Sequence, residues 1–154
     1  MKVTDILSAN AMQFDLQAAT KAEVIQALTK RLVSCGNVTD EAQFLEAVNQ
    51  REEHATTGIG FGVAIPHGKS TAVTESTIGF AKLAQPVEWQ SLDDKPVEIV
   101  FLLAIAEHDK SDGHLKILAE IATKLMDDQV VLDLKAAESP EQVIQSFTEG
   151  VYEQ

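Results

Sequence analysis

The segment "VEIVFLLAIA" at residues 97–106 is apolar at nearly every position, and Glu98 is its only charged residue. A strand with one wet face alternates apolar and polar residues, so this unbroken run predicts a central strand covered on both faces. Two other extended segments precede it, "GIGFGVAIPH" at 58–67 and "TIGFAKLAQPVEW" at 77–89, each bounded by turn-forming residues. We therefore expect a β-sheet in the middle of the molecule.

Helical patterns lie on either side of these strands. Residues 20–36 and 39–55 come before them, and residues 114–128 and 139–151 come after. The predicted N-caps are Thr20, Thr39 and Ser139, and the predicted apolar stripe of 114–128 is Leu115, Leu118, Ala122 and Leu125. The fold class expected for residues 1–154 is α/β, a layered single domain with a short mixed β-sheet flanked by helices.

Composition narrows the possible partners. The chain of 154 residues has a net charge of −12, whereas nucleic acids and anionic membranes attract clustered Lys and Arg. A basic protein partner is compatible with this charge, although acidity also serves solubility alone. The single cysteine, Cys35, allows no internal disulfide, and no apolar run approaches the roughly 20 residues that span a bilayer. We expect a cytoplasmic protein with no direct membrane insertion and no nucleic-acid partner.

The segment "TTGIGFGVAIPHGKS" at 56–70 contains the first candidate site residue. Its glycines at 58, 60 and 62 predict a place where the backbone passes close to a ligand or to another strand, as in a glycine-rich hairpin. The spacing matches neither a dinucleotide-binding loop nor a phosphate loop, because Val63 stands where each requires glycine. Pro66 holds its neighbour extended and presents His67 at a strand end, where Gly68 leaves the ring unshielded.

Two more residues complete the candidate site. His114 falls in the first turn of a predicted helix, with Asp112 or Ser111 as its N-cap, where free amide groups favour an anion. Arg51 continues the inward face of the helix at 39–55, which is an unusual direction for a cation. Two imidazoles and a guanidinium suit a phosphoryl group that one ring accepts while the other groups stabilise its oxygens. Each histidine could instead be structural.

No metal or other cofactor is expected. The four histidines lack the i, i+4 pairing of a helical zinc site, and "DKSDGH" at 109–114 departs from the register of a calcium loop. Without a nucleotide loop, the phosphoryl group would arrive already activated and leave in the same form, as in a relay.

Three segments resemble the enzyme IIA component of the bacterial phosphoenolpyruvate-dependent sugar phosphotransferase system, of the fructose–mannitol type and most closely its fructose branch. They are residues 56–70, "VEWQSLDDKPVEIVFLLAIA" at 87–106 and "HLKILAEIATKLMDD" at 114–128, and the resemblance extends from about Ile6 to Phe147. It implies a phosphotransferase in which His67 accepts phosphate on Nε2 from the phosphocarrier HPr. The phosphate then passes to a IIB component, with a IIC permease downstream.

The same resemblance assigns the other site residues. His114 matches the second active-site histidine of the family, Arg51 matches the arginine beside the phosphate, and Thr57 and Gly68 are expected to lie near it. Fructose-type members often carry alanine at the position of Gly68. The nitrogen-related IIA, a regulatory protein, is the alternative because it shares "TGIG" and "AIPHGK". Phe61, "VEW" and "HLKIL" favour the sugar-linked function.

Overall fold

The strand β6 (Val97–Ala106) lies in the middle of a six-stranded mixed sheet. All its residues except Glu98 are buried, which confirms the prediction from its apolar run. It pairs antiparallel with β5 (Thr77–Val87) and parallel with β3 (Val63–Ala64) and β4 (His67–Ser70). The computed structural model describes residues 3–108 and 113–152, with side chains described for 3–108 and 115–148.

The sheet has the order β1-β5-β6-β3-β2, with β4 paired to β6 beyond β3. The short strand β2 (Gly58–Gly60) forms an antiparallel hairpin with β3. The other edge strand, β1 (Leu7–Leu16), runs parallel to β5 and was not predicted from the sequence. Its register shifts between Leu7 and Met12 and again between Gln13 and Leu16. These irregularities break the period of two by which a strand is normally identified.

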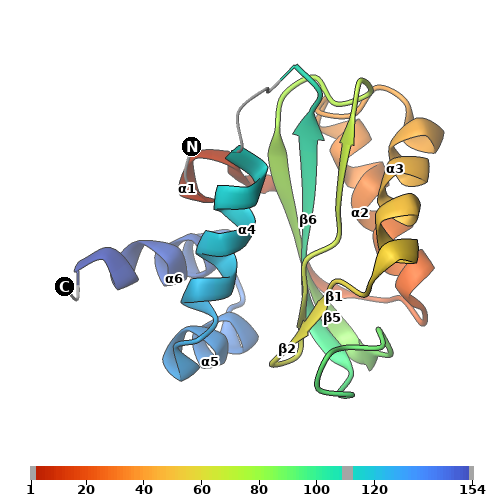
Figure 1. Cartoon of the computed structure of the whole chain (residues 1–154). Coiled ribbons are helices and arrows are strands. Elements are labelled where there is room, and N and C mark those ends of the chain that lie inside the picture. Colours follow the sequence, from red (N-terminus) through yellow and green to blue (C-terminus); the bar gives the residue numbers. More distant parts are fainter. Residues whose placement is uncertain (1–2, 109–112, 153–154) are drawn as a thin grey trace.

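Helices cover both faces of the sheet (Figure 1). On one face lie α2 (Lys21–Ser34) and α3 (Glu41–His54), and on the other lie α1 (Val3–Ile6), α4 (Gly113–Lys124), α5 (Asp128–Ala136) and α6 (Pro140–Tyr152). Each face has its own apolar cluster. The predicted α/β layers around a mixed sheet are therefore confirmed.

The helix ends agree with the sequence at two of three predicted caps. Thr20 accepts a hydrogen bond from the amide of Glu23, and Ser139 accepts one from Gln142. Thr39 is not a cap, because its hydroxyl donates to the carbonyl of Ala72. Asp40 caps α3 instead, accepting from the amide of Gln43. Aspartate is as good a cap as threonine, so adjacent Thr and Asp left the choice to tertiary contacts.

The prediction for α4 was correct in part: Leu125 is buried and Leu118 packs against the core as expected, but the other two residues of the stripe do not lie in the core. The residues buried in the core are Ile117, Ile121 and Leu125, whereas Leu115 and Ala122 are exposed. Both stripes have helical spacing, so the pattern alone did not distinguish them. The helix α5, whose N-cap is Asp127, was not predicted from the sequence. In the part of the chain that the structure describes, no helix has the length and apolar character required to cross a membrane.

Candidate active site

The backbone around His67 is fixed by strand pairing. His67 is the first residue of β4 and lies opposite Leu103 of the central strand. The carbonyl of Pro66 accepts a hydrogen bond from the amide of Leu103 at 3.0 Å. His67 is half-buried. Its backbone is therefore held in place by the sheet, while its side chain remains partly accessible to solvent.

The His67 ring is oriented by a backbone carbonyl. Its Nδ1 lies 3.1 Å from the carbonyl oxygen of Ile65. A carbonyl only accepts hydrogen bonds, so this contact requires the proton to be on Nδ1. In the neutral ring Nε2 is then the nitrogen without a proton, which is the arrangement a nucleophilic imidazole needs.

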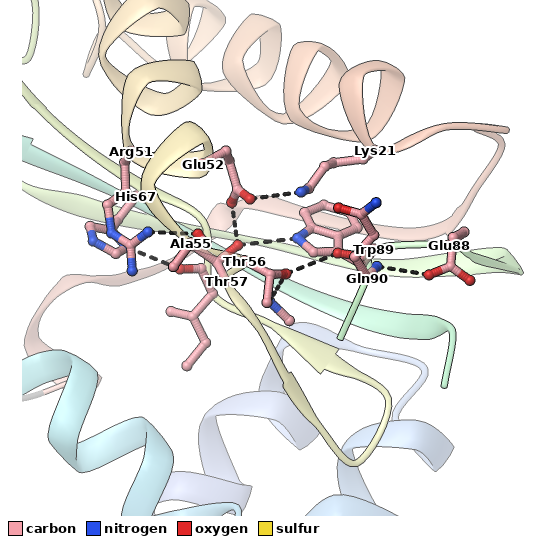
Figure 2. Close-up of polar contacts among 12 residues, drawn as sticks. Lys21, Arg51, Glu52, Ala55, Thr56, Thr57, His67, Glu88, Trp89 and Gln90 are labelled. Carbon is pink, nitrogen blue, oxygen red and sulfur yellow. Dashed lines mark hydrogen bonds and ion pairs between the residues drawn. The ribbon is translucent and has the colours of Figure 1, made fainter. Parts of the chain in front are cut away.

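Arg51 occupies the last turn of α3 and is half-buried. Its Nη1 donates to the carbonyl of Ala55 at 2.8 Å, just beyond the helix end. Figure 2 shows the Arg51 guanidinium and the His67 ring at one end of the labelled group, with Glu88 at the other. The two side chains come from α3 and β4, which pack against each other at Val48 and Gly68.

Gly68 permits close packing of β4 on α3. A Cβ atom at this position would lie 2.9 Å from Cγ2 of Val48 and 3.1 Å from its backbone nitrogen. Val48 is one turn before Arg51 on the same helix. The glycine therefore lets the helix that carries Arg51 approach the strand that carries His67, a role that the sequence did not reveal.

The remaining candidates differ in what the structure describes. His114 is the second residue of α4, but its side chain lies outside the described residues, as do the predicted caps Ser111 and Asp112. Thr57 is buried, at 4% exposure. Its hydroxyl accepts from Nε1 of Trp89 at 3.1 Å and donates to Oε1 of Glu52, so two side chains of the protein already bind it.

Glu52 and Trp89 are site residues that the sequence did not suggest. The second carboxylate oxygen of Glu52 pairs with Nζ of Lys21 at 2.8 Å, and the same ammonium lies 5.5 Å from the centre of the Trp89 ring. These side chains come from α2, α3 and the segment after β5, as Figure 2 shows. Only their adjacency in the fold identifies them.

The glycines before His67 form the hairpin that was one of the two alternatives. Gly60 and Gly62 have φ values of +102° and +79° in the β2–β3 turn, which explains their lack of a side chain. Gly58 faces Ser91, whose Oγ would lie 2.5 Å from an added Cβ. The close approach that these residues serve is therefore to the protein itself, at the lower end of the sheet in Figure 1.

We expect Gly58→Ala to destabilise the fold. The new methyl group would lie 3.0 Å from Cα of Ser91 as well as near its Oγ, so the backbone must move at a cost of about 1–3 kcal/mol. Chemical denaturation measures this loss. Gly79→Ala is the matched control, because its Cβ would make ordinary contacts of 3.5 Å or more, and an equal loss there would contradict the steric explanation.

Asp93 anchors the tip of the hairpin. Its two carboxylate oxygens accept from the amides of Lys95 at 3.1 Å and Phe61 at 3.2 Å. These bonds to the charged form, that of Lys95 first, lower the pKa of the Asp93 carboxyl. Phe61, with a φ of +63° and half of its surface exposed, is held in a left-handed conformation at this tip.

The lowered pKa of Asp93 predicts a pH dependence. Stabilisation by its carboxylate is complete above the pKa of the unfolded state and is lost as the pH falls through the lower folded pKa. Asp93→Asn should therefore reduce the free energy of unfolding at pH 7 and make little difference at pH 2. Urea denaturation at both pH values measures the free energy of unfolding. A stability difference between wild type and Asp93→Asn that grew on acidification would contradict the stabilising role of the Asp93 carboxylate.

The arrangement has the parts of a phosphoryl acceptor: a half-buried imidazole with its proton on Nδ1 and an arginine from a neighbouring helix. Within the described part of the chain, no three His, Cys, Asp or Glu side chains gather as a metal site would require. An imidazole nitrogen without a proton and a guanidinium from the helix packed on β4 are groups suited to accept and stabilise a phosphoryl group.

Comparison with known proteins places this chain in a family. Residues 5–150 match the family described as the phosphoenolpyruvate-dependent sugar phosphotransferase system, EIIA 2. A fructose-specific EIIA component of Haloferax volcanii is 36% identical over 98% of this chain and 99% of its own length. The crystal structure of a nitrogen regulatory IIA protein from Neisseria meningitidis superposes with a TM-score of 0.86 at 28% identity, covering 94% of this chain and 97% of that one.

Another relative is much longer. The EIIABC component specific for 2-O-alpha-mannosyl-D-glycerate from Escherichia coli is 32% identical over 96% of this chain, which spans 22% of that protein. The similarity is thus confined to one part of that longer protein. Since the family match covers nearly all of the sequence and the fold agrees, this chain belongs to the EIIA type 2 family of phosphotransferase-system components.

Proposed function

We propose that this protein is a phosphocarrier that accepts a phosphoryl group on Nε2 of His67 from HPr and passes it to a IIB component. The observation that carries the proposal is the contact between Nδ1 and the Ile65 carbonyl, which leaves Nε2 as the nucleophile. The family membership supports the phosphotransferase class. The donor and acceptor proteins follow from the resemblance of the site residues to that family.

In the proposed transfer, the lone pair of His67 Nε2 forms a bond to phosphorus while the N–P bond of the donor phosphohistidine breaks. The bonding electrons return to the donor nitrogen, and the three phosphoryl oxygens keep their negative charge throughout. Arg51 stabilises that charge, which lies on the oxygens between the attacking and leaving nitrogens. The reverse sequence transfers the group to IIB.

Of the two proposed cellular roles, we favour sugar-linked transfer of the fructose type. The relative from Haloferax, named as fructose-specific, matches this chain over almost the whole of both lengths. The alternative is a regulatory protein whose phosphorylation state other proteins detect, and the Neisseria structure supports it. In either role the protein would act in the cytoplasm, and a IIC permease would follow only in the first.

A reconstituted transfer assay tests the proposal. The purified chain should gain label from phosphoenolpyruvate only when enzyme I and HPr are both present. The product should be labile in acid and stable in alkali, as expected of phosphohistidine rather than phosphoserine. Adding a fructose IIB–IIC pair then separates the roles, because sugar phosphate forms only if the function is sugar-linked. Failure to gain any label would overturn both.

We expect His114→Ala to slow phosphoryl transfer without abolishing it. By resemblance this residue donates a hydrogen bond to the phosphoryl oxygens rather than attacking phosphorus, so a deletion leaves the nucleophile in place. Initial rates of labelling by phosphorylated HPr measure the effect, and the exposed Lys116 of the same helix supplies the control variant, Lys116→Ala. Complete loss of labelling would contradict this role.

A further inference from the structure

The carbonyl that orients His67 belongs to a peptide unit with no amide hydrogen of its own. Pro66 follows Ile65, so the Ile65–Pro66 peptide cannot be held by donating a hydrogen bond. It is held through its neighbours instead. The amide of Ile65 donates to the carbonyl of Thr57 at 2.9 Å, and the carbonyl of Pro66 accepts from Leu103 at 3.0 Å. The position of this acceptor therefore depends on Thr57.

Thr57 is held by hydrogen bonds of its side chain as well as of its backbone. The indole of Trp89 can only donate and the carboxylate of Glu52 can only accept, so the direction of both hydrogen bonds at the Thr57 hydroxyl is determined. The hydroxyl is buried, and losing either partner would leave a polar group without compensation.

Glu52 links this arrangement to Arg51. It is the next residue on α3, and its side chain is 9% exposed. One carboxylate oxygen binds Thr57 and the other pairs with Lys21 at the start of α2. The last turn of α3, which carries the guanidinium, is thereby tied both to the segment that orients His67 and to the neighbouring helix (Figure 2).

We propose that Thr57 and Glu52 are positioning residues for phosphoryl transfer. They hold the Ile65 carbonyl that keeps the proton on Nδ1 of His67, and they set the place of Arg51 relative to that ring. This inference rests on the proposed function and deepens it. Neither side chain needs to touch the phosphoryl group, which gives Thr57 a role in addition to the nearby position expected from the sequence.

The tautomer of His67 provides a test that needs no phosphorylation. Long-range ¹H–¹⁵N correlation spectra of the unphosphorylated protein distinguish the ring nitrogen that carries the proton. We expect the wild-type ring to be protonated at Nδ1 when neutral. Thr57→Val, which removes the hydroxyl and keeps the shape, should give a mixture of tautomers. Thr57→Ser should restore the wild-type spectrum.

Transfer kinetics supply the second readout. Loss of one positioning hydrogen bond should lower the maximal rate of labelling about five- to tenfold in Thr57→Val. The half-saturating concentration of phosphorylated HPr should stay unchanged, because the partner surface is intact. Glu52→Gln retains an acceptor for Thr57 but loses the ion pair with Lys21, so it should also slow transfer. If Thr57→Val does not fold, Glu52→Gln still tests whether these residues affect the rate of transfer.

Thr29→Val is the matched control. Thr29 is a buried threonine of α2 whose hydroxyl donates to the Ile25 carbonyl at 2.8 Å, away from the Thr57 contacts. Thr29→Val should lower the free energy of unfolding without changing the tautomer of His67 or the rate of phosphoryl transfer. The inference is overturned if Thr57→Val and Glu52→Gln transfer at the wild-type rate, or if the rate of Thr57→Val falls while its His67 spectrum stays unchanged. Absence of label on the wild-type protein would instead refute the proposed function, leaving the tautomer result to stand alone.

Discussion

Replacement of His67 by alanine is expected to eliminate phosphorylation by phosphoenolpyruvate, enzyme I and HPr. In the proposed transfer the imidazole, at the first residue of β4, supplies the nucleophilic nitrogen. Without the nucleophile the N–P bond cannot form, so the effect is a loss of all label rather than a slower rate. Autoradiography after denaturing electrophoresis measures it.

Two further variants sharpen that experiment. His67→Gln keeps a side chain of similar length and a donor for the Ile65 carbonyl but has no nucleophilic nitrogen, so it should be equally inactive. His54→Ala changes an exposed histidine in the last turn of α3 and should be labelled like the wild type. Label that persisted in both His67 variants would mean that another residue is the acceptor.

Arg51→Ala is expected to produce the next largest effect, a decrease of about 10²- to 10³-fold in the maximal rate of labelling. The guanidinium stabilises charge on the phosphoryl oxygens as they pass between two nitrogens, and water replaces a fixed positive group poorly. Arg51→Lys should recover part of the rate, because it restores charge without the planar fork of donors. Rapid-quench measurements with phosphorylated HPr give the rates.

Stability must be separated from catalysis in this variant. Arg51 also donates to the Ala55 carbonyl beyond α3, so its removal should cost about 1 kcal/mol of the free energy of unfolding. Arg31→Ala is a suitable control, since Arg31 of α2 likewise donates to a backbone carbonyl, that of Asn10, at 2.7 Å. A slowing in Arg31→Ala equal to that in Arg51→Ala would show that the effect is structural.

The most reliable sequence predictions concerned elements with strong local signals. The apolar run of β6 indicated its central place, and the caps of α2 and α6 followed from Thr20 and Ser139. The missed elements lacked such signals. The bulged β1 has no regular alternation, and the nine residues of α5 give too short a pattern to stand out.

The site divides in the same way. His67 was evident because Pro66 and Gly68 flank it, and Arg51 because its place on the inward helical face is unusual for a cation. Nothing in the sequence joined Glu52 to Trp89, which is the only tryptophan of the chain and lies 37 positions further on. Their relation through Thr57 appeared only when the hairpin was placed against α3.

By itself, the sequence determined the layered fold class and indicated the residues proposed to carry a phosphoryl group, because burial patterns and side-chain chemistry are local properties of the chain. The tertiary structure placed the proton of the His67 ring on Nδ1, through the contact with the Ile65 carbonyl, and placed Arg51 in the last turn of the helix that packs on β4. Both depend on hydrogen bonds and packing that join α3 and the segment 57–67 to β6, which follows much later in the sequence, and these elements meet only when the apolar faces of the sheet are covered.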